Sequence, residues 1–354
     1  MYQPPPLSEN AAALIFFFTS SAPHSGQAGV GSDRRTNFSK SVSHDWQTYS
    51  YRGTAPPPGR GRYRCDHTRW QVLLAHGDLI ELVPLLLLIP LGLLIWGWVP
   101  ALAGAAVQAT ELGTPFRLSR RTLAVVAREG AVRAVVRLIS PFGRPTEPVA
   151  QRRAIDSAVP VLLLASPPAN RAALAFLTTF LTHRGVRGVH AAQLAKAKSL
   201  DALAQHVGKA AERLAAACES DRVDIVAHGI TGLAAAWWIH HHDGSQHVRR
   251  LITLGTPWRG TRMAVFQRNA VARALTVDAA ALDDLAPCSV PVVAIGSPDD
   301  PFVVPAASAF PDGAVHVVLD GAGHTDLLLS ARTFRAVHTA LTQPMGDPHT
   351  AEPA

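Results

Sequence analysis

The stretch Asp224–Trp238 reads DIVAHGITGLAAAWW and changes its pattern halfway along. The part up to His228 is a short apolar run typical of a buried strand, and a helix-like run begins at Leu233. Small residues join the two runs, with Gly229 at the apex. The stretch therefore predicts a strand, a tight turn and a helix whose backbones approach each other closely.

Short apolar runs and longer helical runs alternate through the second half of the chain. We expect buried strands at 161–165, 223–227, 251–254, 290–295 and 315–319. Helical spacing fits 171–183, 200–218, 233–241 and 331–341. This alternation predicts an α/β fold, a mostly parallel sheet with helices on both faces. Functional side chains then belong at the carboxyl ends of the strands.

Four segments of the chain resemble the α/β-hydrolase fold family, in its bacterial lipase and esterase group. The first is the turn AHGITG, where that group has GHSxGG, and the second is ITLGTPWRGT at 252–261. The others are GSPDDPFVVP at 296–305 and GAGHTDLL at 321–328. The resemblance covers 158–342 and implies an α/β-hydrolase-like domain over 155–343.

The resemblance implies roles for particular residues. Asp300 stands for the catalytic acid, because its spacing to Val303 fits better than that of Asp299, and His324 stands for the catalytic histidine. The ligand is expected to contact residues of two loops at the same edge of the sheet: Ala165, Ser166, His228 and Ile230. Neither a cofactor nor a metal is expected.

Two departures from the family pattern affect the chemistry. Gly229 stands where the family has its serine nucleophile, and glycine has no hydroxyl for acyl transfer. Ala165 and Ser166 replace the His-Gly of the oxyanion loop, where the loss of one donor costs a factor of about 10²–10³ in rate. Glycine adopts the strained apex conformation at little cost, so the turn is expected to persist without the reaction.

Together with the long uncharged stretch at 82–110, these features favour a membrane-anchored protein of lipase and esterase type that is catalytically impaired and binds a ligand or partner. The alternative is an active carboxylic ester hydrolase that uses Asp300 and His324 with an unconventional nucleophile or water. A lipid or an ester-like small molecule is the expected ligand in either case.

The histidines 240–242 and 247 cluster after the predicted helix 233–241, but consecutive side chains on a helix point in different directions. Favourable placement at a helix carboxyl end is the preferred interpretation. The cysteines, at 65, 218 and 288, form no disulfide or metal-binding pattern.

The N-terminal residues 1–70 are rich in Pro, Ser, Gly and Arg and are predicted to be disordered, as is the tail 344–354. The net charge of +7 and the pI near 9.8 suggest an anionic partner. No nucleic-acid-binding motif accompanies the scattered arginines, so we expect attraction to anionic lipid and not to nucleic acid.

Residues 79–110 are predicted to form a membrane anchor, because the stretch from Leu82 to Thr110 carries no charge and exceeds the about 20 residues that a spanning helix needs. The expected location is a bacterial inner membrane, crossed once. Arginines occur on both sides of the stretch, so the sequence does not decide on which side of the membrane the soluble domain lies.

The segment 115–142 alternates apolar and arginine positions at helical spacing and predicts an amphipathic helix. Its apolar positions are Leu118, Leu123, Val126, Ala131, Val135 and Leu138. Such a helix would lie on a membrane surface or pack on the folded domain, and the sequence does not choose between them.

Overall fold

The computed structural model describes residues 42–44, 47–49, 78–143, 159–166, 169, 171–266, 271, 275–276, 282, 285 and 288–343. The chain divides into two units, Met1–Leu73 and Leu74–Ala354. In the first unit, β1 (Val42–His44) and β2 (Gln47–Tyr49) form an antiparallel pair. These strands lie within the stretch 1–70, for which disorder is predicted. The rest of that stretch and the tail 344–354 lie outside the described residues.

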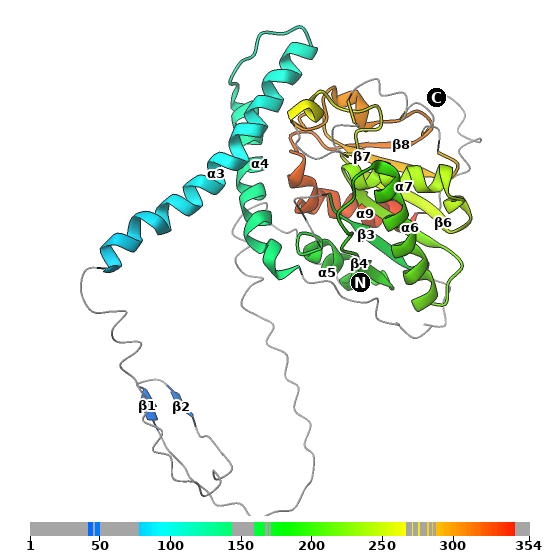
Figure 1. The fold of residues 1–354 in the computed structure, drawn as a ribbon, viewed down its shortest axis with the longest axis horizontal. Helices are drawn as coiled ribbons and strands as arrows, with labels where there is room; N and C mark the ends of the chain where they lie inside the picture. The colour runs from blue at the N-terminus through cyan, green and yellow to red at the C-terminus, as the bar shows by residue number, and fades with distance from the viewer. Residues whose placement is uncertain are drawn as a thin grey trace, which may run out of the picture. The chain divides into compact units, whose positions relative to one another are not determined.

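A six-stranded parallel sheet forms the centre of the second unit, in the order β4-β3-β5-β6-β7-β8 (Figure 1). The strands are β3 (Val161–Leu164), β4 (Val189–Ala191), β5 (Val223–His228), β6 (Val248–Leu254), β7 (Val292–Gly296) and β8 (Val315–Val318). The parallel α/β class predicted by the alternating runs is therefore found. The edge strand β4 is an addition that the sequence did not predict.

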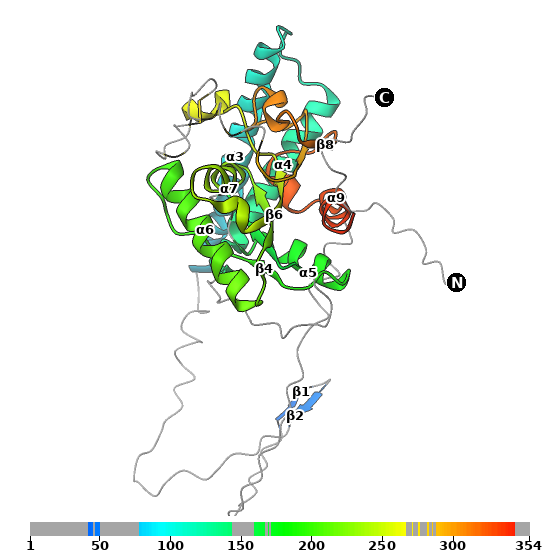
Figure 2. The same cartoon turned by 90° about the vertical axis from the view of Figure 1, so that its right-hand side faces the viewer.

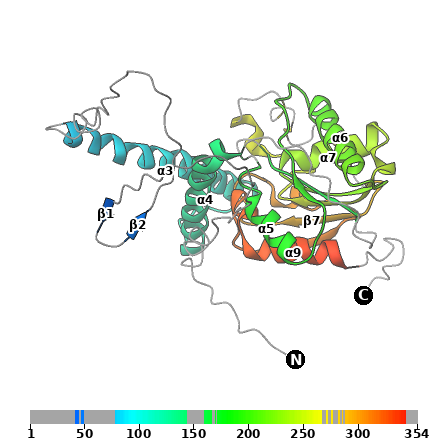
Figure 3. The same ribbon diagram turned by 90° about the horizontal axis from the view of Figure 1, so that it is seen from below.

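Helices cover both faces of this sheet (Figures 2 and 3). One face carries α6 (Leu200–Ala217) and α7 (Ile230–His241), and the other carries α5 (Ala175–His183) and α9 (Ala331–Thr342). Because side chains alternate along a strand, Leu162 and Leu164 pack in the α6–α7 layer, whereas Val161 and Leu163 pack in the α5–α9 layer. Both layers are apolar, so every central strand is buried on its two sides.

Two further helices precede the sheet. They are α3 (Asp78–Glu111) and α4 (Arg120–Ile139), and they lie against each other (Figure 1). The indole Nε1 of Trp98 donates to the carbonyl of Ala127 at 3.2 Å, and a side chain on Gly130 would overlap the Trp98 ring. Glycine at position 130 therefore permits the close approach of the two helices.

Within the residues described, no helix combines the length and the apolar character needed to cross a membrane. The anchor predicted over 79–110 falls in α3, where many side chains of the first half lie outside the described residues. It stays a prediction.

The face that α4 buries differs from the apolar stripe in its sequence. Leu123, Val135 and Leu138 are 42–65% exposed, whereas Glu129 and Gly130 are buried together with Val125, Val126 and Val136. The helix packs on the folded domain, which is one of the two arrangements that the sequence left open. It does so through close backbone packing and hydrogen bonds of Glu129, while much of its apolar stripe stays exposed.

Candidate functional site

The turn between β5 and α7 has the predicted strand–turn–helix form, with Gly229 at its apex. Gly229 has φ 57° and ψ −126°, a conformation that favours glycine because it lacks Cβ. Its N–H donates to the carbonyl of Leu254 at 2.8 Å, and its carbonyl accepts from the Thr256 hydroxyl at 2.9 Å. Both partners belong to β6 and the loop after it, so the neighbouring strand holds the apex in place.

The loops after β7 and β8 bring Asp300 and His324 together. Nδ1 of His324 lies 2.8 Å from Oδ2 of Asp300. The other carboxylate oxygen of Asp300 accepts from the backbone N–H groups of Phe302 at 2.8 Å and Val303 at 3.2 Å. The carboxylate is buried and each of its oxygens has a donor, so it fixes the orientation of the imidazole ring.

The neighbouring acid, Asp299, has other partners. It accepts hydrogen bonds from Arg121 of α4 and from the backbone N–H of Gly321 at 2.7 Å. Asp299 thus joins α4 to the loop that carries His324, whereas Asp300 contacts the imidazole itself.

The two histidines of the site have pKa values shifted in opposite directions. Burial lowers the pKa of His324, but the charges of Asp300 and Glu129 and the hydrogen bond to Asp300 outweigh it, so that the pKa is raised. Burial, together with the charge of His324, lowers the pKa of His228 well below its usual value. His228 is therefore neutral at pH 7, and its Nε2 donates to the carbonyl of His324 at 3.0 Å.

The free side of the His324 ring faces the apex of the turn. A Cβ atom on Gly229 would lie 3.1 Å from Nε2 of His324 and 2.6 Å from the hydroxyl oxygen of Ser166. The imidazole nitrogen and the Ser166 hydroxyl thus flank the space that a side chain at 229 would enter. The Ser166 hydroxyl donates its hydrogen bond to the carbonyl of His228 and not to His324.

The remaining predicted contact residues, Ala165 and Ile230, are the chain neighbours of Ser166 and Gly229. Ala165 follows β3 directly and packs with the α5–α9 layer, and Ile230 is the first residue of α7. Thr231 is fully buried and donates to the His228 carbonyl at 2.9 Å, so it braces the turn from inside. The structure therefore brings Ser166, His228, Asp300 and His324 together around Gly229. For Ala165 and Ile230 a role in ligand contact stays a prediction.

Two residues of α4 near His324 were not predicted. Glu129 is fully buried and accepts hydrogen bonds from the backbone N–H groups of Thr325 and Asp326. Arg133 lies between the rings of Trp96 and Phe302, 4.6 Å from each centroid. The only sequence signal for Glu129 is that it is the single acidic residue between Arg117 and Ile139.

The histidines at the carboxyl end of α7 and directly after it do not converge on one point. Nε2 of His242 lies 2.6 Å from Oδ1 of Asp201, the ring of His241 packs on Trp237, and His247 stacks on Trp238. Among the described residues there is no group of three or more metal-ligating side chains. Cys218 and Cys288 are free thiols, and Cys65 lies outside the described residues.

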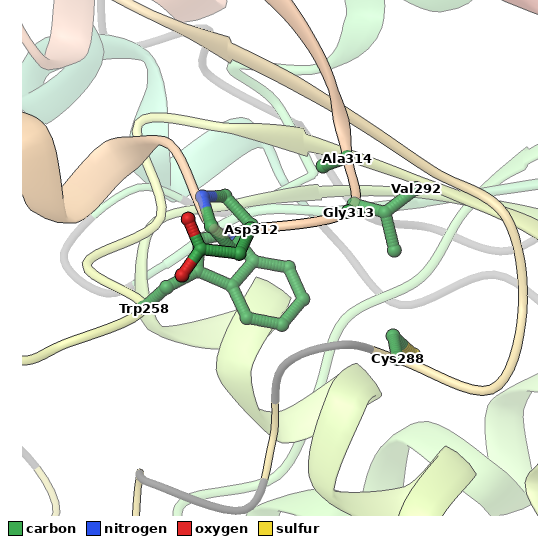
Figure 4. Close-up of a pocket in the computed structure, with 7 residues that line it drawn as sticks. Trp258, Cys288, Val292, Asp312, Gly313 and Ala314 are labelled. Atoms are coloured by element: carbon green, nitrogen blue, oxygen red, sulfur yellow. The ribbon is translucent and has the colours of Figure 1, made fainter. Parts of the chain in front are cut away.

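Figure 4 shows a small pocket beside the loop before β8, with Trp258 and Cys288 on its wall. The pocket has a volume of ≈ 10 Å³, which is room for about one water molecule. Its lining includes none of the residues Gly229, Ser166, Asp300 and His324. It therefore does not bear on the chemistry of the site.

Comparison with solved structures identifies the fold. Aspergillus fumigatus lipase B superimposes with a TM-score of 0.51 at 14% identity, over 74% of this chain and 87% of the lipase. The fold is that of the α/β-hydrolases. Bacillus licheniformis lipase BlEst2 in its mature form aligns with a TM-score of 0.48 at 14% identity, over 57% of this chain and 97% of that lipase. No family model and no curated protein matches the sequence.

Proposed function

We propose that this α/β-hydrolase-fold protein binds an ester or a lipid and is impaired in hydrolysing it, because Gly229 replaces the serine nucleophile. The observation that carries the proposal is the position of Gly229 opposite Nε2 of His324, where a Cβ would lie 3.1 Å from that nitrogen. A histidine base in this position removes the proton from the hydroxyl of a nucleophile, and glycine has no hydroxyl.

The position of Ser166 supports the same proposal. Its hydroxyl occupies part of the space beside His324 but donates to the His228 carbonyl, so its proton is not shared with the base. Activation of a nucleophile requires that the base accept the proton of the attacking hydroxyl. In this arrangement the Ser166 hydroxyl fills the site without being activated.

The test is an ester hydrolysis assay on the full chain with p-nitrophenyl butyrate. We expect the unmodified protein to show only the background rate, and Gly229→Ser to gain little because Ser166 crowds the new side chain. The double variant Gly229→Ser with Ser166→Gly removes the crowding, and we expect it to be the most active of the three. Turnover by the unmodified protein that His324→Ala abolishes would contradict the proposal.

The second candidate function is an active carboxylic ester hydrolase with Ser166 as the unconventional nucleophile. The Ser166 hydroxyl lies close to the space in front of Nε2 of His324, which favours this candidate. Rotation of the Ser166 side chain would move its hydrogen bond from the His228 carbonyl to the imidazole nitrogen. If this candidate holds, both Ser166→Ala and His324→Ala abolish turnover. If water is the nucleophile, only His324→Ala does so.

We also propose that the protein works at a membrane, as a single-pass protein of a bacterial inner membrane. The uncharged stretch of α3 supports this location, as do the large apolar side chains that α3 and α4 expose, among them Leu91, Ile95, Val99, Leu123 and Leu138. The test is extraction of membranes with alkaline carbonate, from which an anchored protein is not released. Release of the full chain into the supernatant would contradict the anchor.

A further inference from the structure

Helix α4 places a buried carboxylate against the loop that carries His324. Glu129 has no exposed surface, and both of its oxygens lie 2.9 Å from the backbone nitrogen of Thr325. One of them also accepts from the N–H of Asp326 at 3.1 Å. These two donors are the residues that directly follow His324 in the chain.

A carboxylate in this position requires a physical reason. An ionised group that leaves water loses several kcal/mol of hydration unless hydrogen bonds replace it. Burial raises the pKa of Glu129, and its bonds to Thr325 and the charge of His324 offset only part of that rise. The backbone N–H groups of Thr325 and Asp326 compensate part of the lost hydration of the carboxyl group, and the carboxyl group in turn orders those backbone groups.

Other contacts of α4 hold the same loop from outside. Arg128 donates to the carbonyl of Gly321 and forms an ion pair with Asp326 at 2.7 Å. A side chain on Gly323 would collide with Glu129, so the loop backbone lies directly against the carboxyl group. The chain is thus held by α4 both before and after His324.

The titratable groups around the imidazole come from three parts of the chain. Asp300 follows β7, Glu129 and Arg133 lie on α4, and His228 ends β5. Asp300 and Glu129 raise the pKa of His324, while Arg133 lowers it. His228 is neutral and contributes a hydrogen bond to the His324 carbonyl instead of a charge.

We propose that Glu129 is a positioning residue of this site, which holds the backbone after His324 and so directs the imidazole toward Gly229. The role does not require ester turnover, since it concerns the geometry of His324 alone. Helix α4, which precedes the hydrolase-like segment in the sequence, is in this view a structural part of the site.

The test uses the full chain with isotope-labelled histidine and measures the pKa of the His324 ring by NMR. The His324 signal is identified by its absence from the spectrum of His324→Gln. Glu129→Gln keeps the shape of the side chain and removes its charge. We expect the His324 pKa to fall and hydrogen exchange of the Thr325 and Asp326 amides to quicken. Amide hydrogen exchange in β5 and β6 should stay as in the unmodified protein. This control separates a local loss of positioning from destabilisation of the whole domain.

Two further variants complete the experiment. Arg137→Gln changes an exposed charge on the same helix and is expected to leave both readouts unchanged. Glu129→Asp keeps the charge on a shorter side chain. The pKa of His324 in this variant should lie nearer to the pKa in the unmodified protein than the pKa in Glu129→Gln does. Glu129→Asp also serves as the folded test if Glu129→Gln does not fold, in which case the loop amides should still exchange faster. An unchanged His324 pKa with unchanged amide exchange in the folded variants would overturn the proposal.

Discussion

The Asp300–His324 pair and the Gly229 apex belong to one site but differ in what surrounds them. Around Asp300, the imidazole and two backbone N–H groups satisfy both oxygens of a buried carboxylate. At the apex there is no side chain, and the neighbouring Ser166 hydroxyl is directed to a backbone carbonyl. The difference is that the Asp300–His324 pair is fully hydrogen-bonded, whereas the turn opposite it presents no side chain to the imidazole.

The largest contrast between the two regions should appear in stability. Asp300→Ala leaves His324 Nδ1 and two backbone donors without their partner, and we expect a loss of about 3–5 kcal/mol in the free energy of unfolding. Ser166→Ala removes one hydrogen bond to a carbonyl that Thr231 also contacts, so we expect a loss of about 0.5–1.5 kcal/mol. Urea unfolding of the two variants measures both. Equal losses of unfolding free energy in the two variants would show that the Asp300 region and the apex region do not differ as described.

The second prediction concerns crowding at the apex. Gly229→Ser places a side chain on a residue with φ 57° and beside the Ser166 hydroxyl, and we expect a loss of about 1–3 kcal/mol in the free energy of unfolding. Ser166→Gly should recover part of this loss, because it removes the hydroxyl but not the backbone strain. A double-mutant cycle measures the recovery, and strictly additive losses would show that Ser166 does not occupy this space.

The third prediction uses pH to separate His324 from His228. The raised pKa of His324 means that its contribution to stability is fully present below pH about 6.5 and is lost as pH rises through its folded pKa. The lowered pKa of His228 has the opposite effect, so its contribution is present above that pH and is lost as pH falls.

Unfolding of His324→Gln and His228→Gln between pH 5 and about 9 tests these signs. The stability gap between unmodified protein and His324→Gln should narrow as pH rises. The gap for His228→Gln should narrow as pH falls. Gaps that move in the same direction for both variants would show that the assignment of charges in the site is wrong.

The smallest effect is expected at the outer edge of the site. Arg121 pairs with Asp299, but its side chain is 58% exposed, and water and salt screen such a pair. Arg121→Gln should therefore cost less than about 1 kcal/mol in unfolding free energy, and raising the salt concentration should reduce the cost further. Thermal unfolding at low and high salt measures it. A loss as large as that of Asp300→Ala would mean that Arg121 is a central support of the acid loop.

The sequence predicted those parts of the fold that depend on apolar pattern and local turn chemistry. The central strands are buried on both faces, so they appear as nearly unbroken apolar runs such as VLLL and VVAI. The edge strand Val189–Ala191 has only one buried residue and lacks that pattern, so it was not predicted. The positions of Gly229, Asp300 and His324 follow from the parallel sheet, which gathers loops at one edge.

The contribution of α4 could not be predicted in the same way. Its apolar positions suggested which face would pack, but the packed face contains Glu129 and Gly130, while Leu123 and Leu138 stay exposed. A carboxylate enters a protein interior only where hydrogen-bond donors or opposite charges meet it, and here the donors are the backbone N–H groups of Thr325 and Asp326. These residues lie nearly 200 positions later in the chain, and no local pattern connects them to Glu129.

The most direct test of the central claim is labelling of the full chain with a fluorophosphonate, which reacts covalently with an activated serine. Mass spectrometry of the treated protein identifies any modified residue. Because the Ser166 hydroxyl donates to the His228 carbonyl and Gly229 has no hydroxyl, we predict no phosphonylated serine. Modification of Ser166 that disappears in the His324→Ala variant would contradict the account and identify the protein as a working serine hydrolase.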